Sequence, residues 1–293
     1  MDVIEILKNK KGFIAALDQS GGSSTKTLKN YGIDESLITS EEVMYKYIHE
    51  MRTRVITNES FSSDKIIGVI LFKHTMENKI GDLYTADYLN NKGILSFLKV
   101  DVGLAEECDG VQLLKDIPDL DSICENAKKY HIIGTKMRSV IKEYNEYGIK
   151  KVIEQQFKLA KIIISHGLIP IIEPEVDINS PYKKQIETFM KKEIMRALDK
   201  CSSEDYLMFK FTIPDIPNYY DELLRKKNVL RIVALSGGYE RSVAVEKLKE
   251  NKKMIASFSR ALLEGLSASD SDEEFTNKLA SSIDEIYKAS VSK

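Results

Sequence analysis

Eight short runs of apolar and β-branched residues recur along the chain, and most are separated by stretches in which apolar residues have helical spacing. Alternating strands and helices are typical of a parallel sheet covered by helices. Eight is also the number of strands that closes a (β/α)8 barrel. The sequence therefore predicts an α/β fold, a single (β/α)8 TIM barrel, with strands near residues 13–18, 65–72, 94–100, 132–137, 168–176, 207–213, 230–236 and 255–259.

The stretch 148–167 shows the helical pattern most clearly, since seven apolar residues between Ile149 and Ile164 recur at helical spacing. This pattern predicts a helix on the outside of the barrel. Thr39 with Glu42 and Ser271 with Glu274 have capping-box spacing and predict two further helix starts. Because no linker or long repeat interrupts the series, we expect one domain over residues 1–293.

Charge and hydropathy exclude several classes of function. The 293 residues include 43 basic and 45 acidic side chains, dispersed along the chain, for a formal net charge of -2. Such a balance argues against nucleic acid or an anionic membrane as a partner. The first eleven residues do not read as a signal peptide, and no apolar run approaches the roughly 20 residues that span a bilayer.

Cysteine and histidine positions bear on compartment and metal binding. The three cysteines lack paired spacing, as expected for reduced cysteines of a cytosolic protein, and the four histidines are scattered without a metal-ligand pattern. We therefore expect a cytoplasmic protein without a metal site; homo-oligomerisation stays open. The residues concerned are Cys108, Cys124, Cys201, His49, His74, His131 and His166.

Polar residues lie at the carboxyl ends of seven of the eight predicted strands, where active sites of barrels and doubly wound sheets gather. Only the second run, which ends near Phe72 and Lys73, contributes none. The others end in Asp18, Lys99 with Asp101, Lys136 with Arg138, Glu173 with Glu175, Lys210, Ser236, and Ser257 with Arg260. A single lysine there is usually solvated or paired, but a cluster of charges from several strands is better explained by function.

Strand alternation gives Lys210 a direction. In the run 206–213 one face is wholly apolar, with Leu207, Phe209, Phe211 and Ile213, and should pack on helices. Lys210 lies on the other face and should point into the barrel mouth. There, desolvation and neighbouring cations would favour the nucleophilic free amine. By the same parity Lys136 shares a face with Arg138, and Glu173 shares one with Glu175, so two lysines and two carboxylates could converge.

Two glycine-bearing turns suit a phosphate group, because adjacent glycines let backbone N–H groups approach an anion and serine hydroxyls add donors. They are 18–24, Asp-Gln-Ser-Gly-Gly-Ser-Ser, and 235–239, Leu-Ser-Gly-Gly-Tyr. Barrels often bind phosphate after strands seven and eight. Arg260, just beyond the eighth predicted strand, adds a guanidinium whose fork geometry fits phosphate.

These segments, taken as an ordered set, resemble the class I fructose-bisphosphate aldolases, in particular their shorter bacterial branch. The resemblance runs nearly end to end and is carried by Ala-Ala-Leu-Asp-Gln-Ser-Gly-Gly at 15–22, Phe-Leu-Lys-Val-Asp at 97–101, Gly-Thr-Lys-Met-Arg at 134–138, Pro-Ile-Ile-Glu-Pro-Glu at 170–175, Met-Phe-Lys-Phe at 208–211, Leu-Ser-Gly-Gly at 235–238 and Ser-Phe-Ser-Arg at 257–260.

The resemblance implies a cofactor-free enzyme that cleaves fructose 1,6-bisphosphate through a Schiff base on Lys210. It implies that Glu173 is the general acid and base, that Asp18 holds the C4 hydroxyl and that Lys136 stabilises charge. Lys99 and Arg138 would be further substrate contacts. One phosphate would bind Ser236, Gly237, Ser257 and Arg260, and the other Ser20 and Ser23.

Two positions depart from the animal enzymes of that family. A glutamate follows the aspartate of the first motif there, whereas this chain has Gln19, so no base chemistry is assigned to it. Those enzymes also use a C-terminal tyrosine to protonate the enamine, whereas this chain ends Ser-Val-Ser-Lys and its last tyrosine is Tyr287. The resemblance therefore supplies no proton donor for that step.

Two alternatives stay open on sequence. A Schiff-base aldolase acting on another ketose bisphosphate, such as tagatose 1,6-bisphosphate, would have the same residues, because the two sugars differ only at C4. A non-catalytic protein that binds sugar phosphates is disfavoured, since binding alone needs no imine-forming lysine.

Overall fold

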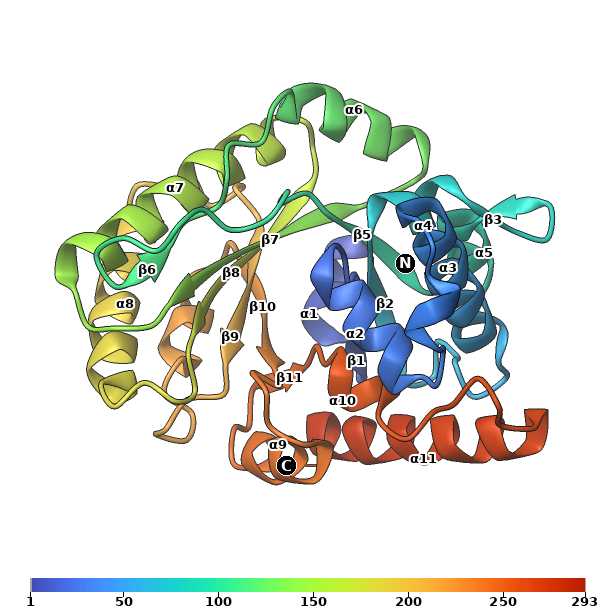
Figure 1. Ribbon diagram of the computed structural model, residues 1–293. Coiled ribbons are helices and arrows are strands. Elements are labelled where there is room, and N and C mark those ends of the chain that lie inside the picture. Colours follow the sequence, from blue (N-terminus) through green and yellow to red (C-terminus); the bar gives the residue numbers. More distant parts are fainter. Residues whose placement is uncertain (1, 293) are drawn as a thin grey trace.

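Eight parallel strands form the barrel that the sequence predicts. The computed structural model describes residues 2–292, and Figure 1 shows the strands enclosed by helices. Neighbours pair in the order of the chain, and the backbone N–H of Ala16 donates to the carbonyl of Phe258 at 3.2 Å, which joins the first strand to the segment after the last. The strands are β1 (Phe13–Leu17), β2 (Ile66–Leu71), β5 (Leu95–Lys99), β7 (Gly134–Ile141), β8 (Ile169–Val176), β9 (Leu207–Thr212), β10 (Val229–Leu235) and β11 (Met254–Ala256).

Helices fill most connections between the strands. The connection from β9 to β10 carries only the 3-10 helix η2 (Asp221–Arg225), and a second 3-10 helix, η1 (Glu35–Leu37), precedes α3. The short strands β3 (Lys79–Ile80), β4 (Leu83–Tyr84) and β6 (Val111–Gln112) lie in the loops. The α-helices are α1 (Val3–Asn9), α2 (Gly22–Asn30), α3 (Glu41–Thr57), α4 (Lys73–Glu77), α5 (Thr85–Asn91), α6 (Leu120–Lys129), α7 (Glu146–Ser165), α8 (Lys183–Leu198), α9 (Arg241–Lys249), α10 (Arg260–Leu263) and α11 (Asp272–Val291).

The helix predictions are confirmed in two cases and wrong in one. Helix α7 is the amphipathic helix expected over 148–167, and α11 begins with the capping box of Ser271 and Glu274. The predicted box at Thr39 is wrong by one residue. Ser40 caps α3 instead, and its hydroxyl accepts a hydrogen bond from the N–H of Val43. This cap is not a capping box, because the side chain of Val43 has no acceptor to return a hydrogen bond to Ser40.

Side chains from alternate strand positions form two apolar cores. In β9, Leu207, Phe209 and Phe211 belong to the core between barrel and helices, whereas Met208 belongs to the core inside the barrel. The outward apolar face predicted for this strand is therefore confirmed. This parity sends the side chain of Lys210, two residues after Met208, to the barrel interior.

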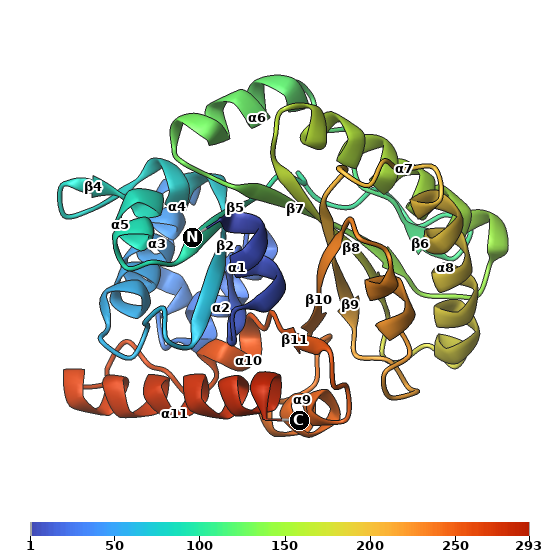
Figure 2. The ribbon, with the colours of Figure 1, turned by 180° about the vertical axis from the view of Figure 1, so that it is seen from behind.

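Helix α1 lies across the amino ends of the strands, in front of the barrel in Figure 2. Its Leu7 packs in the inner core, and Arg231 of β10 donates to the carbonyls of Leu7 at 2.6 Å and Lys10 at 3.2 Å. Burial lowers the pKa of this guanidinium to about 10. With that end covered, the carboxyl ends remain for a ligand. Among residues 2–292, no helix has the length and apolarity that membrane crossing requires.

Candidate active site

A cavity of about 470 Å³ opens at the carboxyl ends of the strands. All twelve site residues predicted from the sequence line it, so the structure brings the whole set together. They are Asp18, Ser20, Ser23, Lys99, Lys136, Arg138, Glu173, Lys210, Ser236, Gly237, Ser257 and Arg260.

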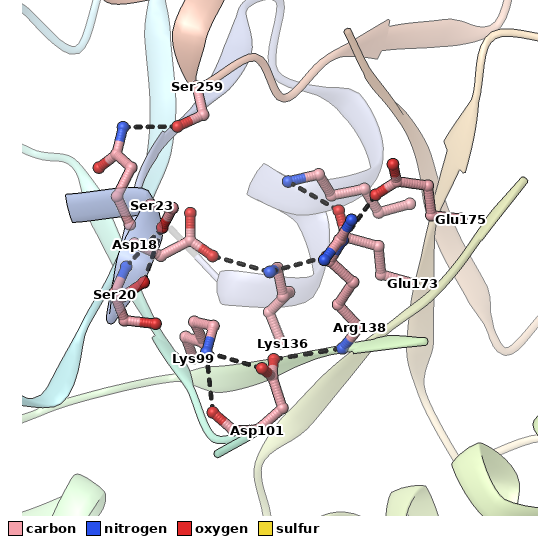
Figure 3. Close-up of polar contacts among 12 residues, drawn as sticks. Asp18, Ser20, Ser23, Lys99, Asp101, Lys136, Arg138, Glu173, Glu175 and Ser259 are labelled. Atoms are coloured by element: carbon pink, nitrogen blue, oxygen red, sulfur yellow. Dashed lines mark hydrogen bonds and ion pairs between the residues drawn. The ribbon is translucent and has the colours of Figure 1, made fainter. Parts of the chain in front are cut away.

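Four charged side chains meet in the depth of this cavity, Asp18 from just after β1 and Lys136, Glu173 and Lys210 from within β7, β8 and β9. Figure 3 labels the first three. The Nζ of Lys136 lies 2.7 Å from Oδ2 of Asp18 and 2.7 Å from Oε2 of Glu173. The other oxygen of Glu173, Oε1, lies 3.2 Å from Nζ of Lys210. All four are buried, with side chains less than a tenth exposed. Glu173 thus contacts both lysines, which is a position from which one carboxyl can exchange protons with a group bound at either amine.

The lysines keep the buried carboxyls ionised. Burial alone would raise the pKa of Asp18, but the charges of Lys136 and Lys210 outweigh it and hold that pKa far below its ordinary value. The same balance of burial against Lys136 and Lys210 lowers the pKa of Glu173. Burial opposes the charge of Lys136, yet Asp18 and Glu173 raise its pKa well above the ordinary value. Lys136 is therefore a fixed cation between two carboxylates.

Two further ion pairs surround this centre. The Nζ of Lys99 lies 2.6 Å from Oδ1 of Asp101, whose other oxygen accepts from the backbone N–H of Arg138 at 3.2 Å. The Nε of Arg138 donates to Glu175 at 2.6 Å. Glu175 therefore pairs with Arg138 and does not contact Lys210. The ring of Phe72, in the strand end that supplied no predicted site residue, lies 5.9 Å from Nζ of Lys99.

The loop after β10 takes a backbone conformation that requires glycine. Gly237 and Gly238 have φ values of +62° and +107°, which favour glycine. A Cβ on Gly237 would also lie only 2.9 Å from Cγ2 of Ile178. Nearby, Ser257 is 1% exposed and its Oγ contacts no hydrogen-bond partner among residues 2–292. A buried hydroxyl beside a cavity and without a protein partner is suited to a ligand.

The turn before α2 is closed by its own serines. The hydroxyl of Ser23 donates to the carbonyl of Ser20 at 2.7 Å and accepts from the N–H of Ser20 at 3.0 Å. Both residues line the cavity on the side of α2, together with Lys26. The cavity lining as a whole has six basic and four acidic side chains, and this surplus of cations favours an anionic ligand.

Three residues of this region were not predicted as site residues from the sequence. Arg52 of α3 is fully buried and donates to Gln19, whose side-chain amide in turn donates to Ser259 at 2.6 Å. Gln19 and Ser259 line the cavity. Ser259 lies in the segment 257–260 that carries part of the family resemblance, but nothing in the sequence marks it as a site residue and not simply the serine before a helix. Arg52 lies on a helix among other charged residues and carried no signal of its burial.

Comparison with known proteins gives the family and the fold. A family model described as "Glycolytic: Fructose-bisphosphate aldolase class-I" matches residues 2–213, a span that ends just after the strand of Lys210. A solved fructose-bisphosphate aldolase from Plasmodium falciparum has a TM-score of 0.76 at 19% identity, with 98% of this chain and 92% of that chain covered. A Corynebacterium glutamicum protein has a TM-score of 0.56 at 12% identity, with 98% and 91% covered.

At such low identities the two structures show the fold alone. The family model, in contrast, covers more than half of the chain and includes Asp18, Lys136, Glu173 and Lys210. The chain therefore belongs to the class I fructose-bisphosphate aldolase family.

Proposed function

We propose that this protein reversibly cleaves fructose 1,6-bisphosphate to dihydroxyacetone phosphate and glyceraldehyde 3-phosphate through a Schiff base on Lys210. The observation that carries the proposal is the contact of Glu173 with Lys210 at 3.2 Å and with Lys136 at 2.7 Å, deep in a cavity with surplus positive charge. An imine-forming amine needs an adjacent acid and base, and a bisphosphate needs cations.

The chemistry follows from where the electrons must go. Glu173 first takes a proton from the Lys210 ammonium, which leaves a free amine to attack the ketone carbon. The carboxyl group then returns this proton to the hydroxyl of the resulting carbinolamine, which leaves as water. The carboxylate then accepts the proton of the C4 hydroxyl as the C3–C4 bond breaks. The bonding pair moves into the protonated imine and forms an enamine, so the iminium is the electron sink.

The other buried groups support these steps. Asp18, which stays ionised, accepts a hydrogen bond from the C4 hydroxyl. Lys136 remains charged and stabilises the oxygen from which Glu173 takes the proton. Lys99 and Arg138 contact the sugar chain from the rim. Each is held by its own carboxylate, Asp101 or Glu175, which fixes the direction of the cation.

The two phosphates bind on opposite sides of the cavity. The proximal phosphate, on the carbon next to the ketone, lies at Ser236, Gly237, Ser257 and Arg260, and the distal one lies near Ser20 and Ser23. Gly237 supports this assignment, because its positive φ shapes the turn that presents backbone donors. Binding both ends fixes the ketone beside Lys210.

The test is reduction with borohydride in the presence of dihydroxyacetone phosphate, followed by peptide mapping. Borohydride converts an imine to a stable secondary amine, so activity should be lost irreversibly and the label should lie on Lys210. Lys136, an equally buried lysine of the same cavity, is an internal control and should stay unlabelled. Lys210→Met should lose cleavage while keeping its circular dichroism spectrum. A label on another lysine, or turnover by Lys210→Met, would refute the proposal.

A further inference from the structure

A glutamine is buried between helix α7 and the strand that carries Glu173. Gln156 is 0% exposed, and every other buried residue of α7 is glycine or apolar. An amide in such a place is costly unless both of its ends are hydrogen-bonded, and an apolar side chain could fill the same space. Packing alone therefore does not explain why a glutamine lies there.

Both ends of this amide are used, and they join two strands. The backbone N–H of Glu173 donates to Oε1 of Gln156 at 3.1 Å, and Nε2 of Gln156 donates to Oγ of Ser139 at 2.9 Å. Because a backbone N–H can only donate, the oxygen of the amide must face β8 and its NH₂ group must face β7. Gln156 thereby ties the main chain of Glu173 to the neighbouring strand from outside the barrel.

The main chain at Glu173 has lost its regular pairing on the other side. Strand β8 is in register with β9 only at Ile171 and Ile172, and Glu173 is the next residue. Pro174, which follows, has no N–H to donate. Since the backbone there is held by few contacts toward β9, the hydrogen bond to Gln156 should matter for where Glu173 lies.

We propose that Gln156 is a positioning residue, which holds the main chain of Glu173 where the carboxylate lies 3.2 Å from Nζ of Lys210 and 2.7 Å from Nζ of Lys136. Gln156 acts only through Glu173, because its side chain lies on the outer side of the sheet. The inference rests on the proposed function, since Glu173 needs this precision only if it moves protons between Lys210 and the substrate.

The first experiment is steady-state kinetics of Gln156→Met with fructose 1,6-bisphosphate. Methionine is similar in length but gives the N–H of Glu173 only a weak acceptor. The value of kcat should fall about tenfold, because small misplacements of a reacting group are costly. KM should stay within about twofold, because the residues proposed to bind the phosphates do not contact Gln156. An unchanged kcat, or a loss of kcat/KM that lies wholly in KM, would overturn the proposal.

Gln155, the preceding residue of α7, offers a matched control. Its Oε1 accepts from the N–H of Leu114 at 2.9 Å, and its Nε2 donates to the carbonyl of Leu114 at 2.9 Å. Gln155→Met also loses two hydrogen bonds and should lower the urea midpoint, yet it should keep kcat within about twofold of the wild type. An equal loss of kcat in both variants would assign the effect to a loosened helix and would overturn the positioning role.

The second experiment tests whether Ser139 orients the amide. Ser139→Ala removes the acceptor of Nε2, so the amide can turn its oxygen away from Glu173, and kcat should fall about threefold. In the Gln156→Met background there is no amide to orient, so the same substitution should leave kcat nearly unchanged. Equal effects in the two backgrounds would show that Ser139 does not act through Gln156 and would overturn this chain of contacts.

Failure of this inference can be told apart from failure of the proposed function. If borohydride does not label Lys210 in the wild type, the proposed reaction falls, and the role of Gln156 falls with it. If labelling and cleavage by the wild type are intact and Gln156→Met keeps the wild-type kcat, only the role of Gln156 falls.

Discussion

The side chains of Asp18, Lys136, Glu173 and Lys210 form a buried network of alternating charge that stability alone does not favour. Taking such groups out of water costs several kcal/mol per ion, and well-packed apolar residues often serve stability as well or better. The arrangement does, however, keep two carboxylates ionised beside two amines in a cavity. The need for ionised groups in a reaction therefore explains this network better than stability does. Its charges should also make the free energy of unfolding depend on pH.

Asp18→Asn should lower the free energy of unfolding at pH 7 by roughly 3 kcal/mol, because Lys136 loses one of its two buried partners. The pKa of Asp18 is far lower in the folded protein than its ordinary value of 3.8. Its ionisation therefore stabilises the fold above about pH 4, and this contribution is lost as the pH falls further. Urea denaturation at several pH values should show wild type and variant converging at low pH.

A matched control for this experiment is Asp64→Asn, which changes an exposed aspartate. That variant should track the wild type at every pH. A difference between Asp18→Asn and the wild type that stays constant down to pH 2 would contradict the lowered pKa of Asp18.

A single site residue could be predicted from the sequence where the signal lay in its own strand, and not where it depended on partners far along the chain. Lys210 and Glu173 follow from strand parity, because an inward polar residue at the end of an apolar strand is unusual by itself. Arg52 could not be found in this way, since its hydrogen-bond partners Gln19 and Thr75 lie 33 and 23 residues away along the chain. Helical periodicity treats an arginine between other charged residues as exposed.

The strand pair β8 and β9 shows how an element positions Lys210, the proposed nucleophile. Only two residue pairs connect these strands in register, Ile171 with Met208 and Ile172 with Phe209. Beyond these pairs the hydroxyl of Thr212 takes the place of backbone hydrogen bonds between the strands. It accepts from the N–H of Val176 at 2.9 Å and donates to the carbonyl of Val176 at 2.7 Å. Lys210 lies between the regular pairs and this side-chain bridge, so both fix its strand.

Thr212→Val should cost roughly 3 kcal/mol of unfolding free energy, because the buried N–H and carbonyl of Val176 both lose this partner while the side-chain volume is kept. The loss should appear as a lower urea midpoint with an unchanged slope. Thr212→Ser retains the hydroxyl and should recover most of the stability. Equal destabilisation by both substitutions would show that the methyl group, and not the hydroxyl bridge, stabilises this part of the barrel.

Elements were predictable to the extent that their pattern was local and strong. The eight apolar runs all overlap strands of the barrel, and the capping box at Ser271 is present. The start of α3 was missed by one residue because Thr39 and Ser40 are both good caps and only the folded chain shows which is used. The short strand β6 pairs antiparallel with the end of β7, a contact that its two residues do not signal.

For the whole molecule, closing the barrel gathers cations and carboxylates from both halves of the chain at one end. The family match covers residues 2–213, whereas Ser236, Gly237, Ser257 and Arg260 lie beyond it. The later strands therefore complete the cavity in three dimensions by adding the loops assigned to one phosphate. The residues proposed for catalysis and those proposed for phosphate binding meet only in the closed barrel.

The groups that the closed barrel brings together also bear on whether a metal ion could take up the electron pair of the broken C3–C4 bond. Among residues 2–292 no group of three or more histidine, cysteine or acidic side chains is placed to hold a metal ion. The buried carboxylates of Asp18 and Glu173 lie against lysine amines, and a metal ion would have to displace these cations. If the iminium of Lys210 is the sink, cleavage of fructose 1,6-bisphosphate needs no Lewis acid.

We therefore expect the rate of cleavage to stay within about twofold of its starting value after exhaustive dialysis against EDTA, since the proposed chemistry has no step for a metal ion. Steady-state assays before and after dialysis, with and without added zinc, measure this directly. Lys210→Met is the control, because added zinc should not restore cleavage to a protein that lacks the amine. Complete loss with EDTA that zinc reverses in the wild type would place the electron sink on a metal and would contradict the lysine mechanism.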